Sequence, residues 1–123
     1  MKRSDLREIV KIEGEGWSDE LDPDDYDWTE EWLPTKLLIP TMPGGRRGWK
    51  SWYAEERSLS RDDKYWDQLE RVWTSDPESV GPIIVAEVSP NSIDIGDGWH
   101  RIAISILRDM SIVPAIVGRR VRR

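Results

Sequence analysis

The spacing of hydrophobic residues changes twice between residues 93 and 117, and each spacing indicates one type of secondary structure. Ile93 and Ile95 flank a polar residue, an alternation that is typical of a half-buried strand. Apolar residues then recur at helical spacing, namely Ile102, Ala103, Ile106, Leu107 and Met110. A β-branched segment from Val113 to Val117 follows. The pattern predicts a strand, a tight glycine turn, a helix and a second strand, and the rest of the chain is arranged around this unit.

Shorter periodic segments predict four further elements. Residues 1–12 are expected to form a helix with Ser4 as its N-cap, and residues 33–39 a strand. Ser60 is expected to cap a helix that runs to about residue 74, and residues 83–88 form another strand. The buried stripe of this second helix is predicted to comprise Trp66, Leu69, Val72 and Trp73.

A candidate anion site lies where the glycine turn meets the helix. The free N–H groups and the positive dipole end of a helix N-terminus attract anions. His100 and Arg101 add side-chain donors there, and an Arg can hold a phosphate by two parallel hydrogen bonds. These features predict a phosphate site formed by Gly98, Trp99, His100 and Arg101. Asp97 is interpreted either as the N-cap or as a Mg²⁺ ligand and catalytic base beside the phosphates.

Residues 98–103, Gly-Trp-His-Arg-Ile-Ala, resemble the Gly-Cys-His-Arg-Tyr-Ala signature of sulfiredoxins, whose fold is shared with the N-terminal domain of ParB partition proteins. Residues 33–40, 75–83 and 112–115 resemble, in order, the family's first strand, its turn into the second strand and its closing strand. The resemblance covers residues 32–118. It implies a single α/β (α+β) domain with a small mixed sheet and packed helices.

The same resemblance implies a nucleotide ligand. Family members bind a nucleoside triphosphate (ATP or CTP) with Mg²⁺, which here suggests a nucleotide hydrolase or phosphotransferase assisted by Asp97. Asp97-Gly98 before His-Arg also resembles the Asp-Gly-His-His-Arg motif of ParB-like small-molecule kinases. The family's nucleotide-binding Lys, Ser and Thr align with Tyr65, Gln68 and Val72. Lys64 is one position away, so Lys64 and Gln68 are the expected nucleotide contacts.

Several positions depart from the family. Trp99 stands where sulfiredoxin has its catalytic cysteine, and the chain contains no cysteine, which excludes thiol-dependent sulfinic acid reduction, disulfides and thiolate metal sites. Pro40 replaces an Arg that closes the family's first strand. The Glu-Asn-x-x-Arg motif of ParB-type CTPases is not found. His100 is the only histidine, which excludes a metal site made of several histidines.

Charge is distributed unevenly over the 123 residues, whose net charge is −6. Residues 13–31 contain ten acidic residues and no Lys or Arg, interspersed with aromatic residues. Residues 1–31 are therefore interpreted as an acidic-aromatic arm that folds over a basic face of its own domain; the alternative is a nucleic-acid mimic or a tail for a protein partner. No apolar segment approaches the roughly 20 residues of a membrane span, so the chain is expected to be soluble and cytoplasmic.

Basic and aromatic residues interleave in residues 43–60, which are interpreted as an insertion in the 32–118 domain; residues 119–123 form a basic tail. This segment offers a candidate surface for single-stranded nucleic acid or a partner, formed by Arg46, Arg47, Trp49, Lys50 and Trp52. The alternative is that its cations only form ion pairs with the acidic arm. Two other functions stay open beside nucleotide binding. One is a non-enzymatic protein-binding or inhibitor protein, and the other is a ParB-like DNA-associated protein or nuclease, which the acidic balance disfavours.

Overall fold

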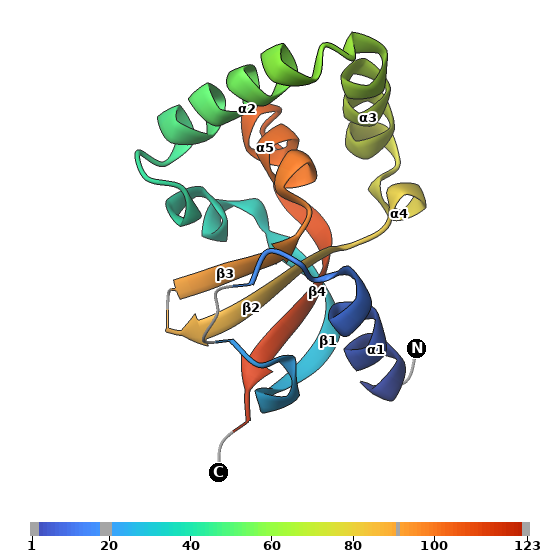
Figure 1. Ribbon diagram of the computed structural model, residues 1–123, viewed down its shortest axis with the longest axis vertical. Coiled ribbons are helices and arrows are strands. Elements are labelled where there is room, and N and C mark those ends of the chain that lie inside the picture. The colour runs from blue at the N-terminus through green and yellow to red at the C-terminus, as the bar shows by residue number, and fades with distance from the viewer. Residues whose placement is uncertain (1–2, 18–20, 91, 122–123) are drawn as a thin grey trace.

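A computed structural model describes residues 3–17, 21–90 and 92–121, which form a four-stranded mixed sheet with packed helices (Figure 1). The strand order is β1-β4-β2-β3. β1 (Tyr26–Pro34) runs antiparallel to β4 (Ile112–Arg120), which runs parallel to β2 (Ile83–Ser89). β2 and β3 (Ser92–Asp97) form an antiparallel pair. The prediction of a small α/β domain with a mixed sheet is confirmed.

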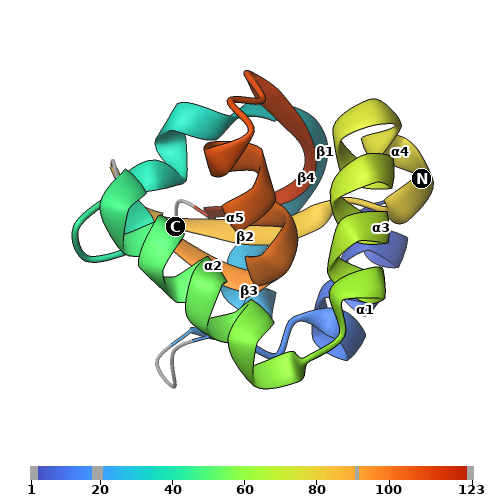
Figure 2. The ribbon, with the colours of Figure 1, turned by 90° about the horizontal axis from the view of Figure 1, so that it is seen from above.

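The helices divide between the two faces of the sheet. α2 (Arg46–Ser60), α3 (Asp63–Ser75) and α5 (Trp99–Leu107) pack over one face, and α2 and α3 flank α5 when the molecule is viewed from above (Figure 2). α1 (Arg3–Glu13) packs against the other face. The four-residue helix α4 (Pro77–Val80) connects α3 to β2. None of the helices described is long and apolar enough to cross a membrane.

Strand β2 forms the centre of the core because both of its faces are covered. Ile83 and Val85 belong to the larger apolar cluster beneath α2, α3 and α5, whereas Ile84 and Ala86 belong to the smaller cluster beneath α1. Successive side chains of a strand point to opposite faces, so a strand covered on both sides is apolar at every position. This explains the unbroken hydrophobic segment in the sequence.

The strand–turn–helix–strand unit at residues 93–117 is confirmed as β3, α5 and β4. Two further helices are confirmed with small shifts. α1 begins at Arg3, so Ser4 lies inside it and is not its N-cap. In α3, Trp66 and Trp73 are fully buried, as the helical spacing predicted, and the helix ends at Ser75, with Asp76 as its C-cap before Pro77.

The prediction of a strand over residues 33–39 is wrong. The first strand is β1, seven residues earlier at its start, and the chain then continues through short 3-10 turns at Thr35–Leu37 and Ile39–Thr41. Pro34 and Pro40 lack the N–H donor that a strand ladder needs, which favours turns here. Residues 26–31, which were expected to belong to a separate acidic arm, are therefore part of the sheet.

Residues 43–60 also differ from expectation, because most of them form helix α2. Trp49 and Tyr53 are the buried positions of this helix, one turn apart. Ser60 is the last residue of α2 and does not cap the next helix. The N-cap of α3 is Asp62, whose carboxylate accepts a hydrogen bond from the Tyr65 N–H at 3.2 Å. At the C-terminal end, β4 extends to Arg120, so the expected basic tail begins within a strand; residues 122–123 lie outside the described part.

Candidate functional site

The turn between β3 and α5 requires a glycine. Gly98 has a φ of 105°, which side-chain-bearing residues rarely adopt, and a Cβ at this position would lie 2.6 Å from Cγ2 of Ile83. Gly98 is the N-cap of α5, and no side chain caps the helix. Within the described chain, the first-turn N–H groups of residues 99–101 have no backbone or side-chain acceptor. They are available to an anion, as the sequence predicted for this position.

Arg101 points inward from the first turn of α5. Its Nη1 donates to the carbonyl oxygens of Gly81 at 2.8 Å and Pro82 at 3.0 Å, and its Nη2 donates to Asp97 Oδ2 at 3.0 Å. The guanidinium also lies over the Trp73 ring, 5.8 Å from its centroid, and only 15% of the side chain is exposed. These contacts use three of the five guanidinium N–H donors, including both on Nη1. In this arrangement Arg101 ties α5 to the chain before β2.

Asp97 is the last residue of β3 and not the N-cap of α5, so that interpretation is wrong. Its carboxylate accepts the hydrogen bond from Arg101 across the turn. No group of three or more His, Asp or Glu residues within the described residues is placed to hold a metal ion. The role of Asp97 as a Mg²⁺ ligand and catalytic base stays a prediction.

The ring of His100 lies where α2, α3 and α5 meet. Its Nδ1 is 3.3 Å from the Tyr65 hydroxyl, and its Nε2 is 3.8 Å from Glu56 Oε2. The ring centroid is 4.3 Å from that of Trp66 and 5.8 Å from that of Trp52. Burial lowers the pKa of His100 below its usual value, and the nearby Glu56 carboxylate opposes this only in part. The imidazole is therefore mainly neutral at neutral pH.

Trp99, the first residue of α5, packs into the helical layer. Its ring centroid is 5.6 Å from that of Trp49 and 5.8 Å from that of Trp52. Trp49 is completely buried, and its indole N–H donates to the Leu38 carbonyl at 3.3 Å. The expectation that Trp49 lies on a partner-binding surface is wrong, because its aromatic ring is core. Trp52 is half-buried at the edge of this cluster.

The cations of the same segment do lie at the surface. Arg46, Arg47 and Lys50 are exposed on α2, and Arg46 forms an ion pair of 2.8 Å with Asp109. Contrary to expectation, none of the three forms an ion pair with the described part of the acidic segment, residues 13–17 and 21–31. Asp24 is 2.9 Å from Lys11 of α1, and Glu31 forms a two-point ion pair with Arg119 of β4. Asp24 and Glu31 are thus paired with cations of α1 and β4.

The first turn of α3 meets the first turn of α5 through Tyr65. Its side chain is 46% exposed, while its hydroxyl reaches His100. Lys64 and Gln68, the expected nucleotide contacts, are exposed on α3 and make no described contact with residues 98–101. Val72 is half-buried. Of the aligned α3 positions, Tyr65 is therefore the one that the fold brings to the glycine turn.

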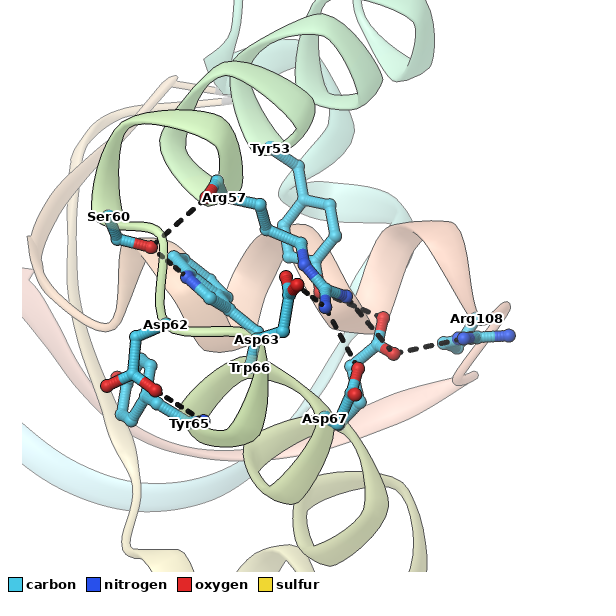
Figure 3. A network of polar contacts seen from close by, with 10 residues as sticks. Tyr53, Arg57, Ser60, Asp62, Asp63, Tyr65, Trp66, Asp67 and Arg108 are labelled. Carbon is cyan, nitrogen blue, oxygen red and sulfur yellow. Dashed lines mark hydrogen bonds and ion pairs between the residues drawn. The ribbon is translucent and has the colours of Figure 1, made fainter.

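Two features of this region were missed from the sequence. Glu56 approaches His100, and the spacing of Trp49, Trp52, Tyr53 and Glu56 along one helix face was the available signal. The second is a polar network between α2 and α3 (Figure 3). Glu70 accepts hydrogen bonds from the Tyr53 hydroxyl at 2.9 Å and from Arg108 at 3.0 Å, and Arg57 donates to Asp67 at 2.9 Å. This network fixes α2 and the end of α5 to α3.

Comparison with protein-family models, with curated proteins and with solved structures finds no match. The functional assignment therefore depends on the geometry of the junction between α3 and α5, together with the motif in residues 97–103.

Proposed function

We propose that this protein binds a nucleoside triphosphate, ATP or CTP, at the junction of α3 and α5, as a domain of the ParB/sulfiredoxin type. The observation that carries the proposal is the approach of Tyr65 to His100, 3.3 Å between Oη and Nδ1. This contact brings the first turns of two helices together at the uncapped N-terminus of α5. Strand β3, the glycine turn and helix α5 follow one another in the order found in phosphate-binding turns.

Each part of the site has a physical role in this proposal. The free N–H groups of Trp99, His100 and Arg101 donate to phosphate oxygens at the positive end of the α5 dipole. The exposed faces of Tyr65 and Trp52 offer stacking surface for the base. Arg101 acts indirectly, because its contacts with Asp97 and the Gly81 and Pro82 carbonyls hold the turn in shape.

The proposal is for binding, without a catalytic step. Asp97, the expected base, is engaged by Arg101, and Trp99 takes the place of the family's nucleophilic cysteine. Mg²⁺ is expected to arrive with the nucleotide, because most of its ligands in such sites are phosphate oxygens and water.

Thermal unfolding with ATP, CTP and GTP, each with Mg²⁺, tests this proposal. A ligand at about 100 times its dissociation constant stabilises a fold by roughly 2.7 kcal/mol. For a domain of this size, that corresponds to a rise in Tm on the order of 5 to 15 °C. Tyr65→Ala should lose most of this rise. Trp32→Ala, a matched control that truncates an exposed aromatic side chain on β1, should keep it. If none of the three nucleotides raises the Tm of the wild-type protein, the proposal is wrong.

A further inference from the structure

An open groove lies at the end of the sheet where β2 begins. β1 and β4 stay paired as far as Pro34 and Ile112, whereas β2 joins β4 only from Ile83, opposite Ala115. The start of β4 therefore lacks a β2 partner. The space left there has a volume of about 420 Å³. Its lining includes residues of β1, of α4, of the segment just before β2 and of the start of β4, namely Glu30, Glu31, Trp32, Glu78, Pro82 and Pro114.

The apolar part of the groove is a tryptophan that α1 leaves uncovered. Trp28 and Trp32 are four residues apart on β1, so strand alternation places both side chains on the face of the sheet that α1 covers. Trp28 is 1% exposed and packs in the cluster beneath α1, whereas Trp32 is 49% exposed. A large aromatic side chain left open in a groove is typical of an interaction surface.

The polar part of the groove is entirely acidic. Its three glutamates come from β1 and α4, and among the described residues no Lys or Arg lines it. The Arg119 guanidinium holds the pKa of Glu31 below its usual value, so this carboxylate stays ionised. Glu30 and Glu78 are exposed and form no described ion pair. The groove therefore presents negative charge that its own surroundings only partly balance, and this charge attracts cations.

We propose that this groove binds an extended peptide segment of a protein partner that carries Arg or Lys residues. One cation lies over the Trp32 ring, where Glu30 and Glu78 flank it, because an aromatic face and two carboxylates both favour a guanidinium or ammonium. Pro82 and Pro114 provide the apolar floor for the neighbouring residue. The incomplete pairing of β4 and the outer edge of β1 offer backbone groups to an added strand. Nucleic acid is disfavoured here because its charge has the same sign as that of the groove.

This surface is separate from the proposed nucleotide site, since β1 and the start of β4 supply it while α3 and α5 supply the other. The acidic and aromatic residues of the N-terminal segment suggested a protein partner as an alternative function, and this groove is where we propose that such a partner binds. The two sites can therefore be tested independently on the same protein.

Fluorescence anisotropy with a labelled peptide in which Arg alternates with Val tests the proposal on the full chain. The Arg peptide should bind, and a matched peptide with Glu in place of Arg should not. Trp32→Ala should weaken binding about tenfold, as the loss of a desolvated cation–π contact predicts. Tyr65→Ala, which does not line the groove, should leave the affinity for this peptide unchanged.

A pair of matched charge reversals separates the groove from the overall acidity of the protein. Glu78→Lys and Glu55→Lys change the net charge equally and both replace exposed helical residues, but only Glu78 lines the groove. Glu78→Lys should weaken peptide binding about tenfold, and Glu55→Lys less than about twofold. Equal losses in both variants, an unchanged affinity in Trp32→Ala, or no binding of the Arg peptide at millimolar concentration would each overturn the proposal.

Discussion

Arg101 donates a hydrogen bond to the carboxylate of Asp97 at 3.0 Å, across the turn that Gly98 makes between β3 and α5. The same guanidinium holds the carbonyl oxygens of Gly81 and Pro82, immediately before β2. A residue that resembles a phosphate ligand in sequence thus joins three parts of the fold. These contacts explain how the first turn of α5 is held in place, while the N-cap residue Gly98 has no side chain to cap the helix.

Arg101→Ala should destabilise the protein. It removes a partly buried cation and leaves Asp97 and two carbonyl groups without their donor, which typically costs about 1 to 3 kcal/mol. Urea unfolding should therefore show a lower midpoint. Arg47→Ala, which truncates an exposed Arg on α2, should change the free energy of unfolding by less than about 0.5 kcal/mol. An Arg101→Ala protein as stable as the wild type would argue that Arg101 is free for a ligand.

Ser105→Ala should destabilise the protein for a related reason. The Ser105 side chain is completely buried; its hydroxyl accepts from the Trp73 indole N–H at 2.7 Å and donates to the Arg101 carbonyl at 2.7 Å. Removing it leaves a buried N–H unpaired, at a cost of about 1 to 3 kcal/mol in the free energy of unfolding. Ser58→Ala, at an exposed position of α2, is the control. Coincident urea curves for Ser105→Ala and the control would contradict this role.

The sequence predicted the centre of this fold better than its edges. β3, α5 and β4 were found because their apolar periods are regular and glycines mark the turn between β3 and α5. β1 was missed because the alternation of Tyr26 and Trp28 lies among carboxylates, which made residues 26–31 resemble an arm. α2 was missed because three glycines near its start, Gly44, Gly45 and Gly48, conceal the helical spacing of Trp49 and Tyr53.

The site was predicted only in part, since side-chain direction is a property of the tertiary structure. The glycine turn and the free helix N-terminus follow from local sequence. Whether Arg101 faces a ligand or the carbonyls of residues 81 and 82 depends on a segment about 20 residues away. The contact of Tyr65 with His100 spans 35 residues and depends on the packing of α3 against α5. Local patterns do not encode such contacts.

Lowering the pH should destabilise the protein through His100. Burial lowers the pKa of His100 in the folded state below the ordinary value of 6.5, so the unfolded chain binds more protons below that pH. This contribution to stability is complete above pH 6.5 and decreases as the pH falls through 6.5 toward the folded pKa. In urea unfolding at successive pH values, the His100→Gln variant should not show this loss of stability with falling pH. An imidazole NMR titration with a pKa above 6.5 would contradict the prediction.

Tyr53 should resist ionisation. Burial, aided by its hydrogen bond to Glu70, raises the pKa of Tyr53 to about 12. The folded state therefore disfavours the phenolate, and this group should lower the stability of the protein as the pH rises past 10, the ordinary tyrosine value. In an ultraviolet absorbance titration, Glu70→Gln should shift one tyrosine to lower pH. Glu55→Gln, at an exposed position of α2, the helix that carries Tyr53, should leave the tyrosine titration unchanged. An unchanged titration in Glu70→Gln would show that Glu70 does not hold this hydroxyl.

The central claim is that a nucleotide binds where α3 meets α5, and NMR of the ¹⁵N-labelled protein during addition of ATP or CTP with Mg²⁺ tests it most directly. The account predicts that the largest shifts fall on the backbone amides of Trp99, His100 and Arg101, together with the single imidazole and the amide of Tyr65. It also predicts that the pKa of His100 rises in the complex, because a phosphate beside the ring favours its charged form. Shifts that fall elsewhere, or no shifts at millimolar nucleotide, would contradict it.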